Sequence, residues 1–153
     1  MSLAEVLSAT PARQYVNQSW TFTSSTNPTY SRTYTVDDPT RKVKVVLAWT
    51  DAPGTAGGTG SQLVNNLNLR VNLLTCSYYV GNAFSGDDVM PLGNCSTAPA
   101  ADTKNNVELV VFTKPEGGTF TVNVIPAAIN GKAIPNSPNA TDQDFALYVY
   151  NAR

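Results

Sequence analysis

The chain has 153 residues, of which 42% are hydrophobic and 14% are charged, and its formal net charge is −1. This length holds one domain with a hydrophobic core, and the balanced charge, without a Lys/Arg cluster, argues against a nucleic-acid or anionic-membrane surface. Histidine is absent, which removes the commonest general base, the Ser-His-Asp and Cys-His nucleophile systems and most zinc sites. We therefore expect no catalytic residues of a familiar hydrolase. No stretch approaches the ~20 apolar residues of a membrane span.

Residues 1–3 read as an artificial start added for expression, and residues 4–153 as a single domain. Alternating residues predict strands over 17–23 and 30–36, because successive side chains of a strand point to opposite faces. Trp20 in the first of these strands is in phase with apolar neighbours. We therefore expect it in the core rather than on an aromatic binding face.

The longest regular stretch runs over residues 43–74 and predicts a hairpin. Its first strand, 43–50, is β-branched and apolar and carries Trp49, which we also expect in the core. A Gly-rich loop follows, since its composition permits nothing else. The second strand, 63–74, alternates cleanly: Leu67, Leu69, Val71 and Leu73 share one face, and Asn66, Asn68, Arg70 and Asn72 share the other.

The second half of the chain predicts short strands around a long irregular loop at 83–104. Residues 78–80, 105–112, 119–125 and 145–150 have strand patterns, and in the second of these we expect Leu109 to face the core and Glu108 to face outward. Tyr148 and Tyr150 lie opposite the apolar face of the last strand, where they are either exposed or cover a neighbouring surface. About eight strands and no helix of normal length indicate an all-β fold, a single β-sandwich or jelly roll with antiparallel strands.

The two cysteines of the chain are informative about its cellular compartment. Cys76 and Cys95 would together close a loop of about 20 residues and restrict the unfolded chain by roughly 3 kcal/mol. Two reduced, buried thiols are the alternative. We favour a disulfide because Cys95 sits in a polar Gly/Ser/Pro stretch rather than in a core strand. A disulfide implies an oxidising compartment, so we expect a secreted, extracellular protein.

Six short segments, taken in order, resemble one known family. Together they are similar to the C-terminal β-barrel (jelly-roll) domain of secreted subtilisin-like serine proteases, whose family pattern is W-[ST]-D-x-P, L-V-N-D-L-D-L, Y-x-G-N, N-N-V-E, G-x-[YF]-T-V and Q-x-F-[AS]-L. The resemblance spans residues 16 to 151. The matching segments are residues 46–54, 63–69, 79–82, 105–108, 118–122 and 143–147. This chain departs from the pattern at Asn66 and Asn68, where the family has Asp, and in a Cys-bearing insertion between Asn82 and Asn105.

The resemblance implies a non-catalytic accessory domain. Its expected partner is the catalytic domain of the same parent chain, which it would stabilise, with protein substrate as a second expected partner. The parent would be a subtilisin-like serine endopeptidase. A carbohydrate-binding or adhesive β-sandwich module of another secreted protein is the alternative. We expect no nucleic-acid or membrane partner.

The resemblance also implies calcium, because similar accessory jelly rolls bind it, and calcium takes six to eight oxygen ligands. The candidate ligands are Asp51, Asn66, Asn68, Asn106 and Glu108. The alternative is a hydrogen-bonded ladder of these side chains across strands, with Asp51 capping its loop. We favour the ladder because two Asn in place of Asp remove two charges. The acidic residues Asp87, Asp88 and Asp102 are expected to be solvated rather than to form a separate site.

Overall fold

The computed structural model of the chain describes residues 11–57, 59, 61–85, 90–113 and 118–153. The artificial start predicted at residues 1–3 and the pair Asp87 and Asp88 lie outside the described residues. The described part contains eight strands and no helix, and hence no helix that could cross a membrane. The strands are β1 (Arg13–Phe22), β2 (Tyr30–Thr35), β3 (Val43–Ala48), β4 (Asn65–Leu74), β5 (Ser77–Val80), β6 (Val107–Phe112), β7 (Thr119–Ile129) and β8 (Gln143–Tyr150).

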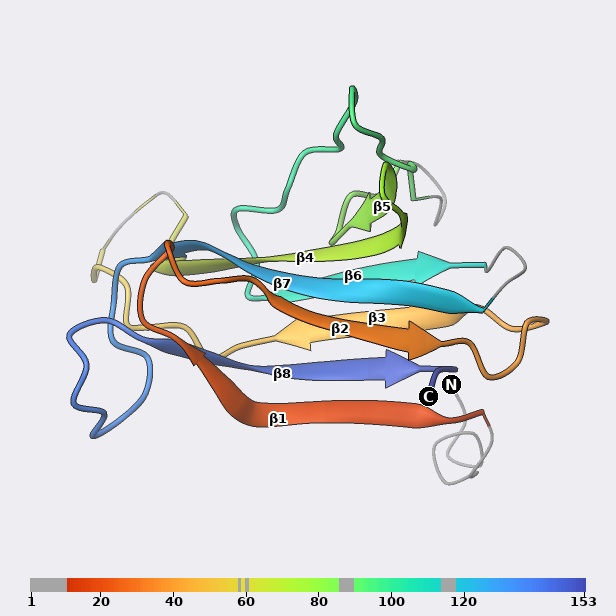
Figure 1. Cartoon of the computed structure of the whole chain (residues 1–153). Coiled ribbons are helices and arrows are strands. Elements are labelled where there is room, and N and C mark those ends of the chain that lie inside the picture. Colours follow the sequence, from red (N-terminus) through yellow and green to blue (C-terminus); the bar gives the residue numbers. More distant parts are fainter. Residues whose placement is uncertain (1–10, 58, 60, 86–89, 114–117) are drawn as a thin grey trace.

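Two four-stranded antiparallel sheets pack face to face (Figure 1). The first, with the order β1-β8-β3-β6, is called the β1 sheet below, and the second, with the order β2-β7-β4-β5, is called the β2 sheet. Apart from the β4–β5 connection, each successive strand crosses to the other sheet. This is the strand order of a jelly roll. The predicted fold class, an all-β sandwich of eight antiparallel strands, is confirmed.

The predicted hairpin is wrong, because β3 and β4 belong to different sheets. β3 pairs with β6 and β8, whereas β4 pairs with β5 and β7. Each strand carries one apolar face, and Leu47 and Leu69 are both fully buried. Two half-apolar strands bury their apolar faces equally well when they face each other across a sandwich. The long Gly-rich loop is able to cross between the layers.

Strand β6 faces the opposite way from the prediction. Glu108, Val110 and Phe112 point inward and are buried, whereas Val107 is 48% exposed and Leu109 is partly exposed. Both faces of this strand are largely apolar, so the alternation alone could not decide between them. Phe112 decides in favour of the observed side, because it packs against Phe120 of the opposite sheet at 5.2 Å between ring centroids.

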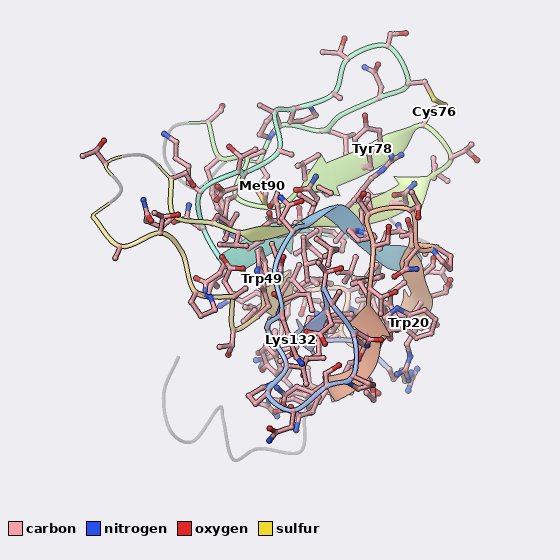
Figure 2. The ribbon with its side chains drawn as sticks, turned by 90° about the vertical axis from the view of Figure 1, so that its left-hand side faces the viewer. Trp20, Trp49, Cys76, Tyr78, Met90 and Lys132 are labelled. Atoms are coloured by element: carbon pink, nitrogen blue, oxygen red, sulfur yellow. A yellow bond between two sulfur atoms is a disulfide. The ribbon has the colours of Figure 1, made fainter. Side chains whose placement is uncertain are left out.

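Trp20 is 41% exposed and does not belong to the core, contrary to the prediction, whereas Trp49 is buried as predicted. Figure 2 shows Trp49 inside the molecule and Trp20 at its edge. The β1–β8 register shifts between Asn17 and Thr21, and Gln18 within this bulge has a left-handed φ of 51°. Such a bulge breaks the alternation. Trp20 therefore lies at the rim, edge-on to Tyr30 with ring centroids 5.5 Å apart.

Candidate functional site

The segments that carry the family resemblance contribute to two polar networks, one at the start of strand β4 and one along strand β6. In the first, the Asp51 carboxylate accepts hydrogen bonds from three backbone N–H groups: Val64 at 2.7 Å, and Asn65 and Ala52 at 2.8 Å each. These bonds close the Gly-rich loop just before β4 begins. Asp51 therefore shapes the crossing between the sheets, which agrees with its predicted role as a loop cap.

Asn65 is the centre of this first network and is completely buried. Its Oδ1 accepts the N–H groups of Asn130 and Gly131, both at 2.8 Å, and its Nδ2 donates to the Gln143 side-chain oxygen at 3.0 Å. The Trp49 indole donates to the Asn65 carbonyl at 3.1 Å. One amide thus joins segments that lie far apart in the sequence. Its full set of partners is what makes its burial tolerable.

The second network covers the free edge of β6. Asn82, in a left-handed conformation with φ 57°, donates its N–H to the Leu109 carbonyl at 3.0 Å, and its side-chain oxygen accepts the Leu109 N–H at 2.9 Å. Its Nδ2 donates to the Val107 carbonyl and to Asp102, each at 2.7 Å. A neighbouring strand would make the same kind of bonds, so this edge is closed to other chains.

Asp102 is held in this network rather than solvated. Although its partial burial acts in the other direction, hydrogen bonds from Asn105, Asn82 and the Lys104 N–H lower the pKa of Asp102. The bond from the Asn105 side chain measures 2.6 Å and that from the Lys104 N–H 2.8 Å. The carboxylate therefore fixes the end of the long loop against β6.

Glu108 lies beneath this network, fully enclosed between the sheets. One carboxyl oxygen accepts the Leu69 N–H of β4 at 2.6 Å, while the other is enclosed without a hydrogen-bond partner. Burial raises the pKa of Glu108 to about 8, with the Leu69 bond opposing the shift and the charge of Asp102 adding to it. A side chain on Gly81 would overlap the Glu108 carboxyl, so only glycine fits there.

The structure does not bring the five candidate calcium ligands together. Asp51 and Glu108 bind backbone N–H groups, and Asn106 donates to the Trp49 carbonyl at 2.8 Å. Asn66 and Asn68 lie on the outer face of β4, whereas Glu108 points inward from the opposite sheet. The predicted ladder does not form either, because β4 and β6 are not paired. Among the described residues, no three His, Cys, Asp or Glu could hold a metal ion, and calcium binding itself stays a prediction.

The predicted disulfide is present: Cys76 and Cys95 are joined, with their Cα atoms 5.0 Å apart. It lies at the edge of the β2 sheet, beside Tyr78 (Figure 2). Tyr78 exchanges two backbone hydrogen bonds with Gly93, at 2.8 and 3.2 Å, and the Arg70 guanidinium lies 3.8 Å from its ring centroid. The disulfide therefore pins the long loop along β5, which buries Tyr78.

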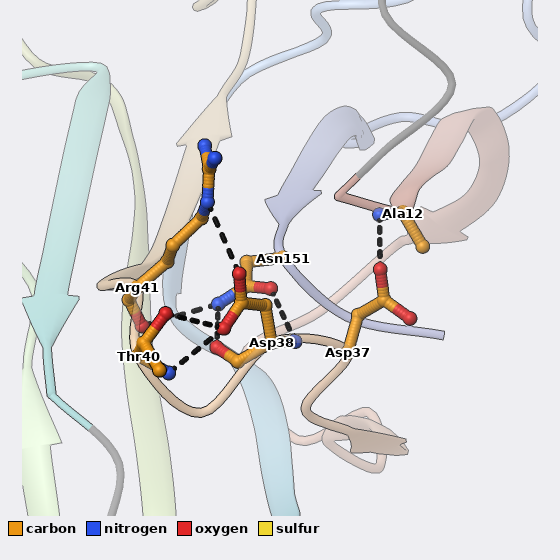
Figure 3. A network of polar contacts seen from close by, with 6 residues as sticks. All are labelled: Ala12, Asp37, Asp38, Thr40, Arg41 and Asn151. Atoms are coloured by element: carbon orange, nitrogen blue, oxygen red, sulfur yellow. Dashed lines mark hydrogen bonds and ion pairs between the residues drawn. The ribbon is translucent and has the colours of Figure 1, made fainter.

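A third network, which the sequence analysis did not predict, joins the start of β1 to the end of β8 (Figure 3). Asn151 is completely buried, with φ 65°. Its Oδ1 accepts the Asp38 N–H at 2.8 Å, and its Nδ2 donates to the carbonyls of Asp38 at 2.8 Å and Arg41 at 3.1 Å. Asp37 accepts the Ala12 N–H at 2.8 Å. Asn151 lies more than 100 residues from Asp38 and Arg41 in the sequence, so no local pattern indicates this network.

The outer face of the β1 sheet carries exposed aromatic side chains and a hollow. Tyr15 is 67% exposed and lies beside the half-buried Tyr148, with ring centroids 5.2 Å apart. The two rings border a hollow of about 330 Å³ floored by Val46, Ala48 and Ala146. Tyr150, the other candidate for this face, is buried. This surface is able to bind by apolar contact, but it holds no arrangement of nucleophile and base.

The comparisons with known proteins leave the family open. No protein-family model matches the chain, and a search of curated proteins finds no match. The resemblance to the protease accessory domain therefore stays a prediction.

Proposed function

We propose that this chain is a non-catalytic accessory domain of a secreted subtilisin-like serine protease, which stabilises the catalytic domain and helps to position protein substrate. The observation that carries the proposal is the state of the two signature carboxylates, Asp51 and Glu108. Both accept backbone N–H groups, and Glu108 is fully enclosed. A general acid or base must reach a substrate proton. The signature is thus better explained as a scaffold than as a catalytic centre.

Two further features support the proposal. The Cys76–Cys95 disulfide is consistent with an oxidising, extracellular compartment. The polar networks around Asn65 and Asn82 fix the loops to the sheets, as expected of a rigid module that stabilises a neighbour.

The test begins with the reading frame upstream of residue 4. A subtilisin-type set of Asp, His and Ser there supports the proposal, whereas a glycosidase or a repeat array there contradicts it. The parent protease with and without this domain is then heated, and residual peptidase activity is followed. We expect faster inactivation without the domain. Amidase activity in the purified 153-residue chain would refute the proposal.

One observation favours a carbohydrate-binding module as the second candidate. The exposed Tyr15 and its neighbour Tyr148 offer ring surface on an open sheet face, and sugars stack on such rings. Binding on a glycan array that is lost in Tyr15→Ala would establish this function. A glycan array without hits would exclude this second candidate function.

A further inference from the structure

The outer face of the β1 sheet is ordered in rows that run across its strands. The register aligns Arg13, Tyr150 and Lys44 in a cationic row, and Tyr15, Tyr148 and Val46 in a tyrosine row. An alanine row follows, consisting of Asn17, Ala146 and Ala48, and Asp144 lies beyond it on β8. Residues of one face recur at every second position of a strand, so these side chains share the outer surface.

The rows differ in height. The tyrosine row projects, since Tyr15 is 67% exposed. The alanine row is low and floors two adjoining hollows, one of about 330 Å³ beside Tyr15 and Tyr148 and one of about 190 Å³ beside Asp144. Ala48 and Ala146 line both hollows. The face is therefore a ridge next to a trough.

The two ends of this face also differ in charge. The cationic end carries Lys44 and Arg13, whose charged groups lie 5.8 and 5.5 Å from the Tyr150 ring centroid. The other end carries the Asp144 carboxylate. Consider a two-fold axis that lies in the plane of this face and runs parallel to the rows, between the tyrosine row and the alanine row. Rotation about this axis would set the ridge of one copy into the trough of another. It would also set Lys44 beside the partner's Asp144. Such a surface complements itself, as a two-fold interface requires.

We propose that a second copy of this chain docks on this face, in a two-fold pair formed by the outer faces of the two β1 sheets. Tyr15 and Tyr148 of each copy fill the alanine trough of the other, and Lys44 of each pairs with Asp144 of the other. This inference does not rest on the proposed function, because it concerns the chain by itself.

The size of the face limits the surface area that the pair can bury. Strands lie ~4.8 Å apart and rise ~3.4 Å per residue, so the sheet from Asp144 to Tyr150 covers roughly 20 Å by 20 Å, or about 400 Å² in projection. A standard interface buries about 800 Å² per partner. The pair is therefore of the weak, transient kind that forms at high protein concentration.

Sedimentation equilibrium on the 153-residue chain, from dilute solution to the highest soluble concentration, tests the proposal. We expect the average mass to rise toward that of a dimer. Ala146→Arg fills the trough with a charged side chain and is expected to weaken the pair at least tenfold. The matched control Thr121→Arg lies on the outer face of the β2 sheet and is expected to leave it unchanged. A monomer at every concentration, or equal effects of the two variants, would overturn the proposal.

A charge reversal gives an answer that does not depend on Ala146. Lys44→Glu faces the partner's Asp144 with a like charge and is expected to weaken the pair. The double variant Lys44→Glu/Asp144→Lys reverses both charges and is expected to restore it. High salt should weaken the wild-type pair, because screening shortens the reach of these charges. A double variant no stronger than the single one would contradict the assigned pairing. Melting curves show that each variant is folded.

Discussion

Glu108 is the residue whose replacement tests the structure most directly. Its carboxyl is fully enclosed, and one of its oxygens has no hydrogen-bond partner among the described residues. Its partner, the Leu69 N–H at 2.6 Å, is satisfied equally well by a carboxylic acid or by an amide. Glu108→Gln therefore keeps the shape and the acceptor and removes the titration.

The raised pKa of Glu108 determines whether the free energy of unfolding rises or falls with pH. Glu108 holds its proton up to about pH 8 in the folded state, against 4.5 when unfolded. Its neutral form favours folding below pH 4.5, and this contribution is lost as the pH rises from 4.5 to about 8. Each pKa unit corresponds to about 1.4 kcal/mol, so the loss approaches roughly 4 kcal/mol. Domains of this kind are stable by about 5–15 kcal/mol, so the effect is readily measured.

The measurement is urea unfolding at several values between pH 5 and pH 8, followed by the fluorescence of the buried Trp49. The chain has no histidine, so few other groups titrate in this window. We expect the free energy of unfolding of the wild type to fall across the window and that of Glu108→Gln to stay nearly level. The two proteins should agree near pH 5. Parallel profiles would refute the reasoning, as would a variant that is equally destabilised at every pH.

Four further predictions concern the networks, the disulfide and the metal. Asn65→Ala should lower the free energy of unfolding by about 3 kcal/mol, because it leaves several buried backbone groups unpaired; a loss under about 1 kcal/mol in urea titration would contradict this. Gly81→Ala should destabilise the fold severely through overlap with Glu108, and Glu108→Ala in the same chain should recover part of the loss; no recovery by thermal melting would locate the clash elsewhere. Replacing Cys76 and Cys95 by Ser should lower stability by roughly 3 kcal/mol and make the long loop the first site of limited proteolysis; first cleavage elsewhere would count against its role as a pin. Because the candidate ligands do not converge, the melting temperature should be the same in millimolar calcium and in chelator; a rise in calcium would reveal a specific site, since a ligand at 100 times its Kd adds about 2.7 kcal/mol.

The family signature allowed the residues of the first network to be recognised in the sequence, but not their distant hydrogen-bond partners. Trp49, Asp51 and Asn65 were recognisable in the sequence as a group, and Asp51 was expected to cap its loop. The bonds between Asn65 and the segment around Asn130 span much of the chain, and no local rule connects them. The same holds for Asn82, whose role as a substitute strand depends on lying beside the edge of β6.

The sequence by itself determined the all-β class, most strand positions and the buried faces of β4, β7 and β8, because an alternation of period two needs only one buried side to be visible. It also indicated the Cys76–Cys95 pair. The tertiary structure alone decided that β3 and β4 separate into different sheets, since strand pairing depends on partners distant in the chain. It also decided which face of β6 is buried, since both are apolar. The alternation that set Leu109 toward the core placed Glu108 outward. Only the opposite sheet supplies the Leu69 N–H and the space over Gly81 that allow Glu108 to be enclosed.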